Sequence, residues 1–154
     1  MIRERWIDPV TDRQQSDIDR IYFLINKGWD NFSSSEKEEW LNGLKGALNY
    51  KDLVRIKENM KILSEMLEID IMIQEIPEIP NENYYESVLE NTEKIRNAYI
   101  IHKDTPKTPS MPVNTFKKWN DIEKIILDVY EILTSEYNYY CGNEIYIESN
   151  IGLL

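Results

Sequence analysis

Cysteine and histidine are almost missing from this chain, which contains one of each, Cys141 and His102. A structural zinc site takes about four Cys or His ligands, a di-iron helical bundle takes two Glu-x-x-His pairs, and an internal disulfide takes two cysteines. The sequence therefore predicts no resident metal and no disulfide framework. Cys141 and His102 form the only possible Cys–His nucleophile pair, and nothing in the sequence brings them together. We expect His102 to complement the negative end of a helix dipole instead.

Glycine is also scarce, with five residues in the whole chain. No two of them lie close enough to cradle a phosphate, and neither G-x-x-x-x-G-K-[ST] nor G-x-G-x-x-G occurs. The H-E-x-x-H zinc motif and the EF-hand calcium loop are missing as well. We therefore expect no catalytic residues, no cofactor and no enzymatic activity.

Basic residues are the minority among the charges, because 28 Asp and Glu stand against 18 Lys and Arg, a formal net charge of −10. Nucleic-acid binding depends on Lys and Arg that displace counterions from phosphates, so this balance argues against a nucleic-acid partner. No apolar run approaches the roughly 20 residues that span a bilayer, and no apolar stretch follows the first charged residues, as a secretion signal requires. We expect no membrane partner and a protein that is cytoplasmic when made.

Five segments combine a helix cap with apolar residues at three- and four-residue steps, the pattern of an amphipathic helix. Their expected starts lie near Thr11, Ser35, Asn49, Asn81 and Thr115. The second of these helices is short. The expected apolar face is Ile18, Ile21, Tyr22 and Ile25 in the first helix and Trp40, Leu41 and Leu44 in the second.

The helices expected after Asn49 and Thr115 repeat one pattern, since each cap is followed by an aromatic residue and a lysine. A weaker copy starts at Asn81. Because a helix with one apolar stripe must bury it against other stripes, the sequence predicts an all-α fold: a compact bundle of four longer helices plus one short helix. We expect the two strongest copies to be in contact, with these side chains buried: Leu53, Ile56, Leu63, Trp119, Ile122 and Val129.

Prolines mark two connections between the expected helices. Residues 68–80 carry alternating isoleucines ahead of Pro77 and Pro80, which predicts an extended segment whose isoleucines lie across the bundle. Residues 104–113 hold three more prolines and are interpreted as an ordered crossover or a semi-rigid linker. They form the one candidate boundary within the helical part.

Acidic residues occur in groups on two of the expected helices: Glu36, Glu38 and Glu39, and Asp121, Glu123 and Glu131. They alternate with lysines at helical spacing, so we interpret them as solvated helix faces and not as paired catalytic carboxylates. Asn59 and Asn91 lie beside apolar stripes, and we expect them to bridge helices or to cap loop backbone.

The carboxyl-terminal residues differ in character from the rest. Residues 137–147 alternate, are rich in tyrosine and isoleucine, and hold Gly142-Asn143 at their centre, which is typical of a β-hairpin. We therefore divide the chain into a helical bundle domain, 1–136, and a C-terminal aromatic hairpin or extended arm, 137–154. The arm is either packed on the chain's own helices or the main partner contact. The candidate partner-binding residues are Tyr137, Tyr139, Tyr140, Ile145, Tyr146 and Ile147.

Two stretches of the sequence resemble helical segments of phage and prophage structural proteins, mostly tail or baseplate associated, from Firmicutes. They are E-K-E-E-W-L-N-G-L-K-G-A-L-N-Y-K-D-L-V-R-I-K-E-N-M over residues 36–60, and K-W-N-D-I-E over residues 118–123. The resemblance runs from about Asp8 to Gly142. It implies a virion-associated setting with virion structural subunits as partners, and it supplies no catalytic residue.

Two functions follow as hypotheses. The first is a non-enzymatic phage or prophage assembly module that mediates protein–protein contacts in a tail- or baseplate-type particle, with a homo-oligomer possible. The second is a small acidic regulatory or inhibitory protein whose surface engages a basic site on a host protein. The identity of the partner separates them, because the first predicts a virion protein and the second a host factor.

Overall fold

The computed structural model describes residues 5–142, with side chains as far as residue 135, and every regular element in that part of the chain is helical. The elements are α2 (Gln15–Lys27), the 3₁₀ turn η1 (Trp29–Asn31), α3 (Ser34–Asn42), α4 (Tyr50–Leu67), α5 (Glu82–Asn97) and α6 (Phe116–Gly142). The expected all-α class is confirmed for these residues.

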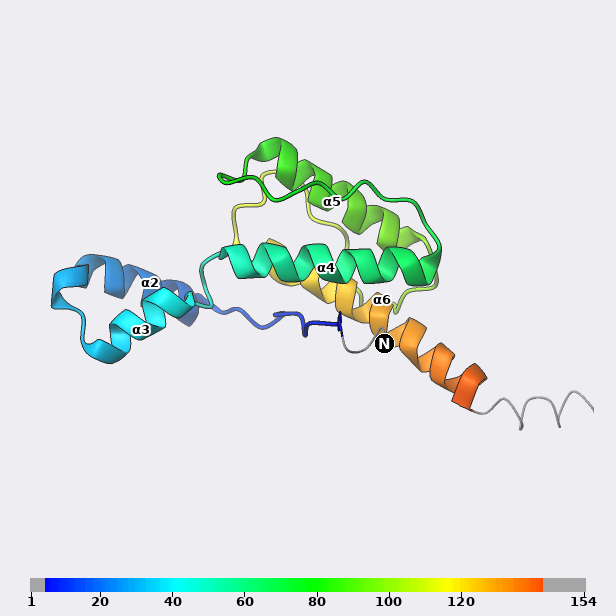
Figure 1. Ribbon diagram of the computed structural model, residues 1–154, viewed down its shortest axis with the longest axis horizontal. Helices are drawn as coiled ribbons and strands as arrows, with labels where there is room; N and C mark the ends of the chain where they lie inside the picture. The colour runs from blue at the N-terminus through cyan, green and yellow to red at the C-terminus, as the bar shows by residue number, and fades with distance from the viewer. Residues whose placement is uncertain (1–4, 143–154) are drawn as a thin grey trace, which may run out of the picture.

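Helices α4, α5 and α6 pack together as a three-helix core, and α2 and α3 lie beside it as a separate pair (Figure 1). The compact five-helix bundle expected from the sequence is therefore divided into a core and an appendage. We call residues 15–48, from α2 to the loop before α4, the α2–α3 hairpin. It has a small apolar cluster of its own, made by Leu24, Phe32 and Leu44.

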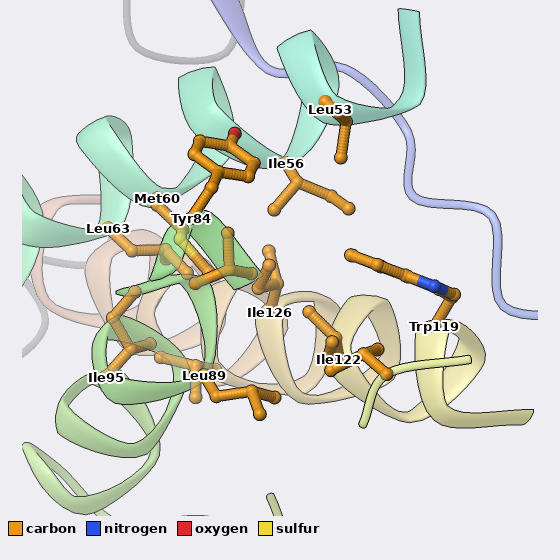
Figure 2. Packing of buried hydrophobic residues seen from close by; sticks show 13 residues of the cluster. Leu53, Ile56, Met60, Leu63, Tyr84, Leu89, Ile95, Trp119, Ile122 and Ile126 are labelled. Carbon is orange, nitrogen blue, oxygen red and sulfur yellow. The ribbon is translucent and has the colours of Figure 1, made fainter. Parts of the chain in front are cut away.

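Side chains from α4, α5 and α6 converge in the main core (Figure 2). The predicted contact between α4 and α6 is present. All six side chains expected at this contact are buried: Leu53, Ile56, Leu63, Trp119, Ile122 and Val129. The Trp119 ring also meets the ring of Tyr85 of α5 edge to face, with the ring centroids 5.6 Å apart.

Four of the five expected helix starts agree with the structure. Ser33, beside the expected Ser35, caps α3 through a hydrogen bond from Glu36 N to its Oγ. Asn49 and Asn81 are the N-caps of α4 and α5, and Lys118 N donates to Thr115 Oγ1 at the start of α6. The side chains of Ser33, Asn81 and Thr115 accept hydrogen bonds from backbone N–H groups that the first turn of a helix leaves without a partner.

The first helix begins later than expected, because α2 starts at Gln15 and not after Thr11. Gln14 is its N-cap, and the Asp17 carboxylate accepts a hydrogen bond from Gln14 N. The backbone of the residues before α2 is hydrogen-bonded to side chains of α4 and α6; for example, Val10 N donates to the carboxylate of Glu123. A helix that began near Thr11 would use those backbone groups itself, so the tertiary contacts delay it.

The apolar faces predicted for α2 and α3 are largely wrong. Leu24 is the side chain that α2 buries completely, whereas Tyr22 and Ile25 are 62% and 55% exposed. In α3 the side chain of Leu41 is 75% exposed and Trp40 is also exposed; only Leu44, beyond the helix, is buried. The reason is that α2 and α3 pack on each other and not on the bundle, so one side of each helix has no neighbour.

The segment 68–80 is extended as predicted, and four of its isoleucines pack on the core: Ile69, Ile71, Ile73 and Ile76. The fifth, Ile79, is exposed. The predicted role of Asn91 is confirmed here, because its Nδ2 donates to the backbone oxygen of Met72 at 2.9 Å. Residues 104–113 form an ordered crossover, since Arg96 Nε donates to Pro106 O and Val113 is buried in the core.

The C-terminal hairpin is not observed. Helix α6 continues through Gly142, so residues 137–142 are helical where the sequence predicts the first strand. The apolar positions of α6 keep their three- and four-residue spacing as far as the tyrosines at 137 and 140, and this helical periodicity outweighs the shorter alternation. Residues 143–154, with the expected second strand, lie outside the described residues.

We predict that replacing Trp119 by Ala lowers the free energy of unfolding by about 3–5 kcal/mol, because the truncation leaves a cavity between α4, α5 and α6. Urea unfolding followed by circular dichroism measures this change. Leu41→Ala is the matched control, since Leu41 is exposed and its truncation should change stability by less than about 0.5 kcal/mol. Equal losses in the two variants would contradict the observed core.

Candidate protein-interaction surface

Four charged side chains are buried together between the N-terminal segment, α4 and α6. Glu123 of α6 is 1% exposed, and it lies against Arg13, Asp52 and Arg55, which are also buried. Arg13 Nη2 donates to Glu123 Oε1 at 2.9 Å, and Arg55 donates to both Glu123 oxygens at 2.9 and 2.6 Å. Arg55 also donates to Asp52 Oδ1 at 2.8 Å. Two positive and two negative groups therefore neutralise one another inside the protein.

Glu123 has no hydrogen-bonding capacity left for a substrate or a metal. Its Oε1 accepts from Arg13 and Arg55, and its Oε2 accepts from Arg55 and from Val10 N at 2.6 Å. These four bonds occupy the four lone-pair positions of a carboxylate. Burial lowers the pKa of Arg55, but its hydrogen bonds and charge interactions with Glu123 and Asp52 outweigh burial and raise that pKa overall. The arrangement suits a structural clamp, because every group in it is already partnered.

This cluster corrects the sequence interpretation, which placed Glu123 on a solvated helix face. A signal was present in the spacing, since Glu123 comes four residues after Trp119 and three before Ile126, on the stripe that became the core. Asp52 likewise comes four residues before Ile56. A charge on an apolar stripe needs a buried partner. The sequence could not identify the partner, because Arg13 is distant along the chain.

Residues 5–14, here called the N-terminal strap, run along α4 and α6 and end at α2. Two asparagines bind its backbone from both sides. Asn59 accepts from Ile7 N at 3.2 Å and donates to Ile7 O at 2.7 Å, while Asn120 accepts from Arg13 N and donates to Arg13 O. The predicted role of Asn59 in capping loop backbone is confirmed. The strap thereby fixes where α2 starts relative to the core.

The α2–α3 hairpin is held together mainly by ion pairs. Arg20 makes a bidentate contact with Glu39, at 3.1 and 2.8 Å, and Lys27 Nζ lies 2.6 Å from Glu36 Oε2. These pairs join α2 to α3 across a cluster of only three buried apolar side chains. The hydrogen bond from Lys27 lowers the pKa of Glu36, and that from Arg20 lowers the pKa of Glu39.

The hairpin exposes more large apolar side chains than it buries. The exposed ones are Tyr22, Phe23, Ile25, Trp29, Trp40 and Leu41. Single exposed apolar residues are ordinary, but a concentration of them on one small unit is typical of a contact surface. We regard the outer surface of the α2–α3 hairpin as the candidate functional site of the described residues.

A second feature is an open cleft of about 640 Å³ beside α6, lined by His102, Asp104, Ser135 and neighbouring acidic side chains. Histidine, aspartate and serine are the residue types of a hydrolytic triad, but their geometry here does not support that chemistry. His102 Nδ1 accepts a hydrogen bond from Asp104 N at 3.2 Å and lies 3.5 Å from Asp104 Oδ2. Both contacts belong to a local turn of two neighbouring exposed residues, and neither involves Ser135.

Among residues 5–135, whose side chains the structure describes, no group of three or more His, Cys, Asp or Glu residues has a geometry that could hold a metal ion. None of the helices described there combines the length and the hydropathy needed to cross a bilayer. The sequence-predicted contact residues Tyr137, Tyr139 and Tyr140 fall on the last turns of α6, and residues 145–147 lie outside the described residues.

No protein-family model, curated protein or solved structure matches the chain. Its function must therefore be argued from the surfaces just described.

We predict that Glu123→Gln lowers the free energy of unfolding by about 3–5 kcal/mol, because it leaves Arg13 and Arg55 buried with one fewer negative charge between them. Urea unfolding measures this loss. Glu131→Gln removes an exposed carboxylate from the same helix and should change stability by less than about 0.5 kcal/mol. A loss below about 1 kcal/mol for Glu123→Gln would show that the clamp does not depend on this charge.

Acid should loosen the hairpin before the core. A carboxyl group whose pKa is lower in the folded state stabilises the fold above its unfolded pKa, and that contribution is lost as the pH falls through the folded pKa. For Glu36 and Glu39 the loss therefore begins near pH 4, the usual range of glutamate, and proceeds below it. Amide hydrogen exchange between pH 7 and pH 3, corrected for intrinsic exchange rates, should show α3 losing protection before α4. Glu39→Gln should weaken the pH dependence of this protection. If the wild-type α3 keeps its protection unchanged at pH 3, the prediction is wrong.

Proposed function

We propose that this protein is a non-enzymatic assembly module that makes protein–protein contacts in a phage or prophage tail- or baseplate-type particle. The observation that carries the proposal is the surface of the α2–α3 hairpin. This unit buries three apolar side chains in its own cluster and exposes six large ones. Such a surface is stabilised when a partner covers it, because burying apolar area releases roughly 25 cal/mol per Å².

The rigid part of the molecule supports this role by holding the hairpin in a fixed place. The N-terminal strap is pinned at Ile7 and Arg13 by two asparagines, and Glu123 binds Arg13 just before α2. A contact element presented in a fixed orientation loses less conformational entropy on binding than a mobile one. The arrangement therefore favours a defined, repeated contact of the kind that a particle needs.

The end of α6 is the second contact that we propose. In Figure 1, α6 extends past the ends of α4 and α5. Among the described side chains of α6, Leu133 is the last that packs on the core, and positions 137 and 140 follow it at helical spacing on the last turns of the helix. We propose that Tyr137, Tyr139 and Tyr140, together with Ile145, Tyr146 and Ile147, bind a neighbouring subunit.

The virion setting rests on the resemblance of residues 36–60 and 118–123 to phage structural proteins. The alternative, a regulatory protein that binds a basic site on a host protein, is favoured by the net charge of −10. Oppositely charged surfaces accelerate association and select partners. The exposed apolar side chains of the hairpin favour the first proposal, because charge alone does not explain them.

Incorporation into particles tests the proposal. We expect mass spectrometry of particles purified from induced cells to detect the full chain in a fixed ratio to the other structural proteins. A variant lacking residues 137–154 should keep its helical circular dichroism and its melting transition, because it retains every core side chain that the structure describes, yet it should be lost from the particles.

One result would count against this function, and a second would change its contact surface. Absence of the full chain from purified particles, together with stable co-purification of a basic host protein, would support the regulatory alternative. Unfolding of the truncated variant would mean that residues 137–154 belong to the core, and the contact surface would then be the hairpin alone.

A further inference from the structure

Helix α2 carries an apolar stripe that points away from its own hairpin. Tyr22 and Ile25 lie one turn apart and are both more than half exposed, whereas Leu24 on the opposite side of the helix is completely buried. Phe23, beside the stripe, is exposed as well. In a helix, positions three and four residues apart form one surface, so Ile18, Tyr22 and Ile25 form a convex ridge, which we call the α2 ridge.

A groove begins where this ridge ends. Its volume is about 290 Å³, and it lies between α2, the loop before α4, and the starts of α5 and α6. One wall is apolar: Ile18, the first residue of the ridge, is part of it, together with Leu48, Tyr85, Phe116 and Trp119. Polar residues, among them Arg13, Asn114 and Thr115, line the rest. The ridge and the groove are therefore neighbouring parts of one continuous surface.

Gly46, in the loop before α4, contacts the backbone of α2 at the wall of the groove. A Cβ atom at this position would lie 2.7 Å from the backbone carbonyl group of Asp17, closer than side-chain atoms approach backbone. The absence of a side chain thus lets the loop before α4 contact the first turn of α2. This close contact holds the ridge and the groove in a fixed relation to each other.

We infer that the α2 ridge docks into this groove on a second copy of the same chain, giving a two-fold symmetric dimer. A two-fold interface joins one surface to itself, so that surface must contain both members of each contacting pair. An apolar ridge next to a groove with an apolar wall satisfies this condition, because each copy offers its ridge and accepts that of its partner. The inference rests on the proposed function and names the partner of the hairpin surface.

The apolar area available is close to what a stable dimer requires. Large side chains have a surface of about 150–250 Å² each, so Tyr22, Phe23 and Ile25, each more than half exposed, offer roughly 300 Å² before the groove walls are added. A standard interface buries about 800 Å² per partner, of which about 57% is apolar, or roughly 450 Å². The ridge together with the adjacent Phe23 offers about two thirds of this area, and the apolar wall of the groove supplies a further part.

Charge near the two surfaces is consistent with self-docking. Asp19 lies one turn before Tyr22 on α2, and Lys117 follows the groove residue Phe116; both are exposed. A ridge entering the groove of a partner brings the acidic flank of one copy toward the basic edge of the other. The net charge of −10 opposes association at long range, so added salt should strengthen the dimer.

Sedimentation equilibrium of the full chain, with two matched variants, tests this inference. We expect the wild type to be a dimer whose dissociation constant falls as salt rises. Tyr22→Asp places a charge in the centre of the ridge and should weaken dimerisation at least about tenfold. Met72→Asp adds the same charge at an exposed side chain on the segment 68–80 and should change the dissociation constant by less than about twofold. Circular dichroism of both variants confirms that they are folded.

The possible outcomes separate this inference from the proposed function. A wild type that remains monomeric at the highest attainable concentration overturns the inference, and a dimer that Tyr22→Asp does not weaken shows that the copies meet elsewhere. If the chain is monomeric and still enters particles, a different protein covers the ridge and the proposed function stands. If the chain dimerises through the ridge and is absent from particles, the inference holds and the proposed function fails.

Discussion

The structure depends on one carboxylate held between two arginines. Glu123 of α6 accepts hydrogen bonds from Arg13 and Arg55 and from the backbone of Val10, and Asp52 completes the charge balance. Through these contacts three distant parts of the chain, the strap, α4 and α6, become one unit. Removing the charge from water costs free energy, and the cost is tolerated because each group finds a partner. The cluster therefore specifies the arrangement of the core more than it adds to its stability.

The α2–α3 hairpin takes its position from that clamp and its internal order from partly buried ion pairs. Asn120 fixes Arg13 at the end of the strap, and Gly46 lets the loop before α4 contact α2 closely. Its own apolar cluster is too small to explain a stable unit by burial. The hairpin is thus the part of the molecule with most to gain from a partner, which is why its surface supports the assembly proposal.

The buried polar groups of this protein serve its own fold. No buried side-chain nitrogen or oxygen among the described residues lacks a hydrogen bond, and the four charges around Glu123 are partnered with one another. The large apolar side chains of the α2–α3 hairpin are exposed instead. Apolar surface of this kind is suited to binding another protein.

By itself the sequence determined the helical class, four of the five helix starts, the extended path of residues 68–80 and the buried stripe of α4 and α6. These features depend on residues a few positions apart, such as the caps at Asn49 and Asn81 and the spacing of Trp119, Ile122 and Val129. Only the tertiary structure decided which stripes meet. It left Tyr22 and Ile25 of α2 in solvent, and it buried Glu123 with Arg13, because these outcomes depend on partners far away in the chain that no local pattern identifies.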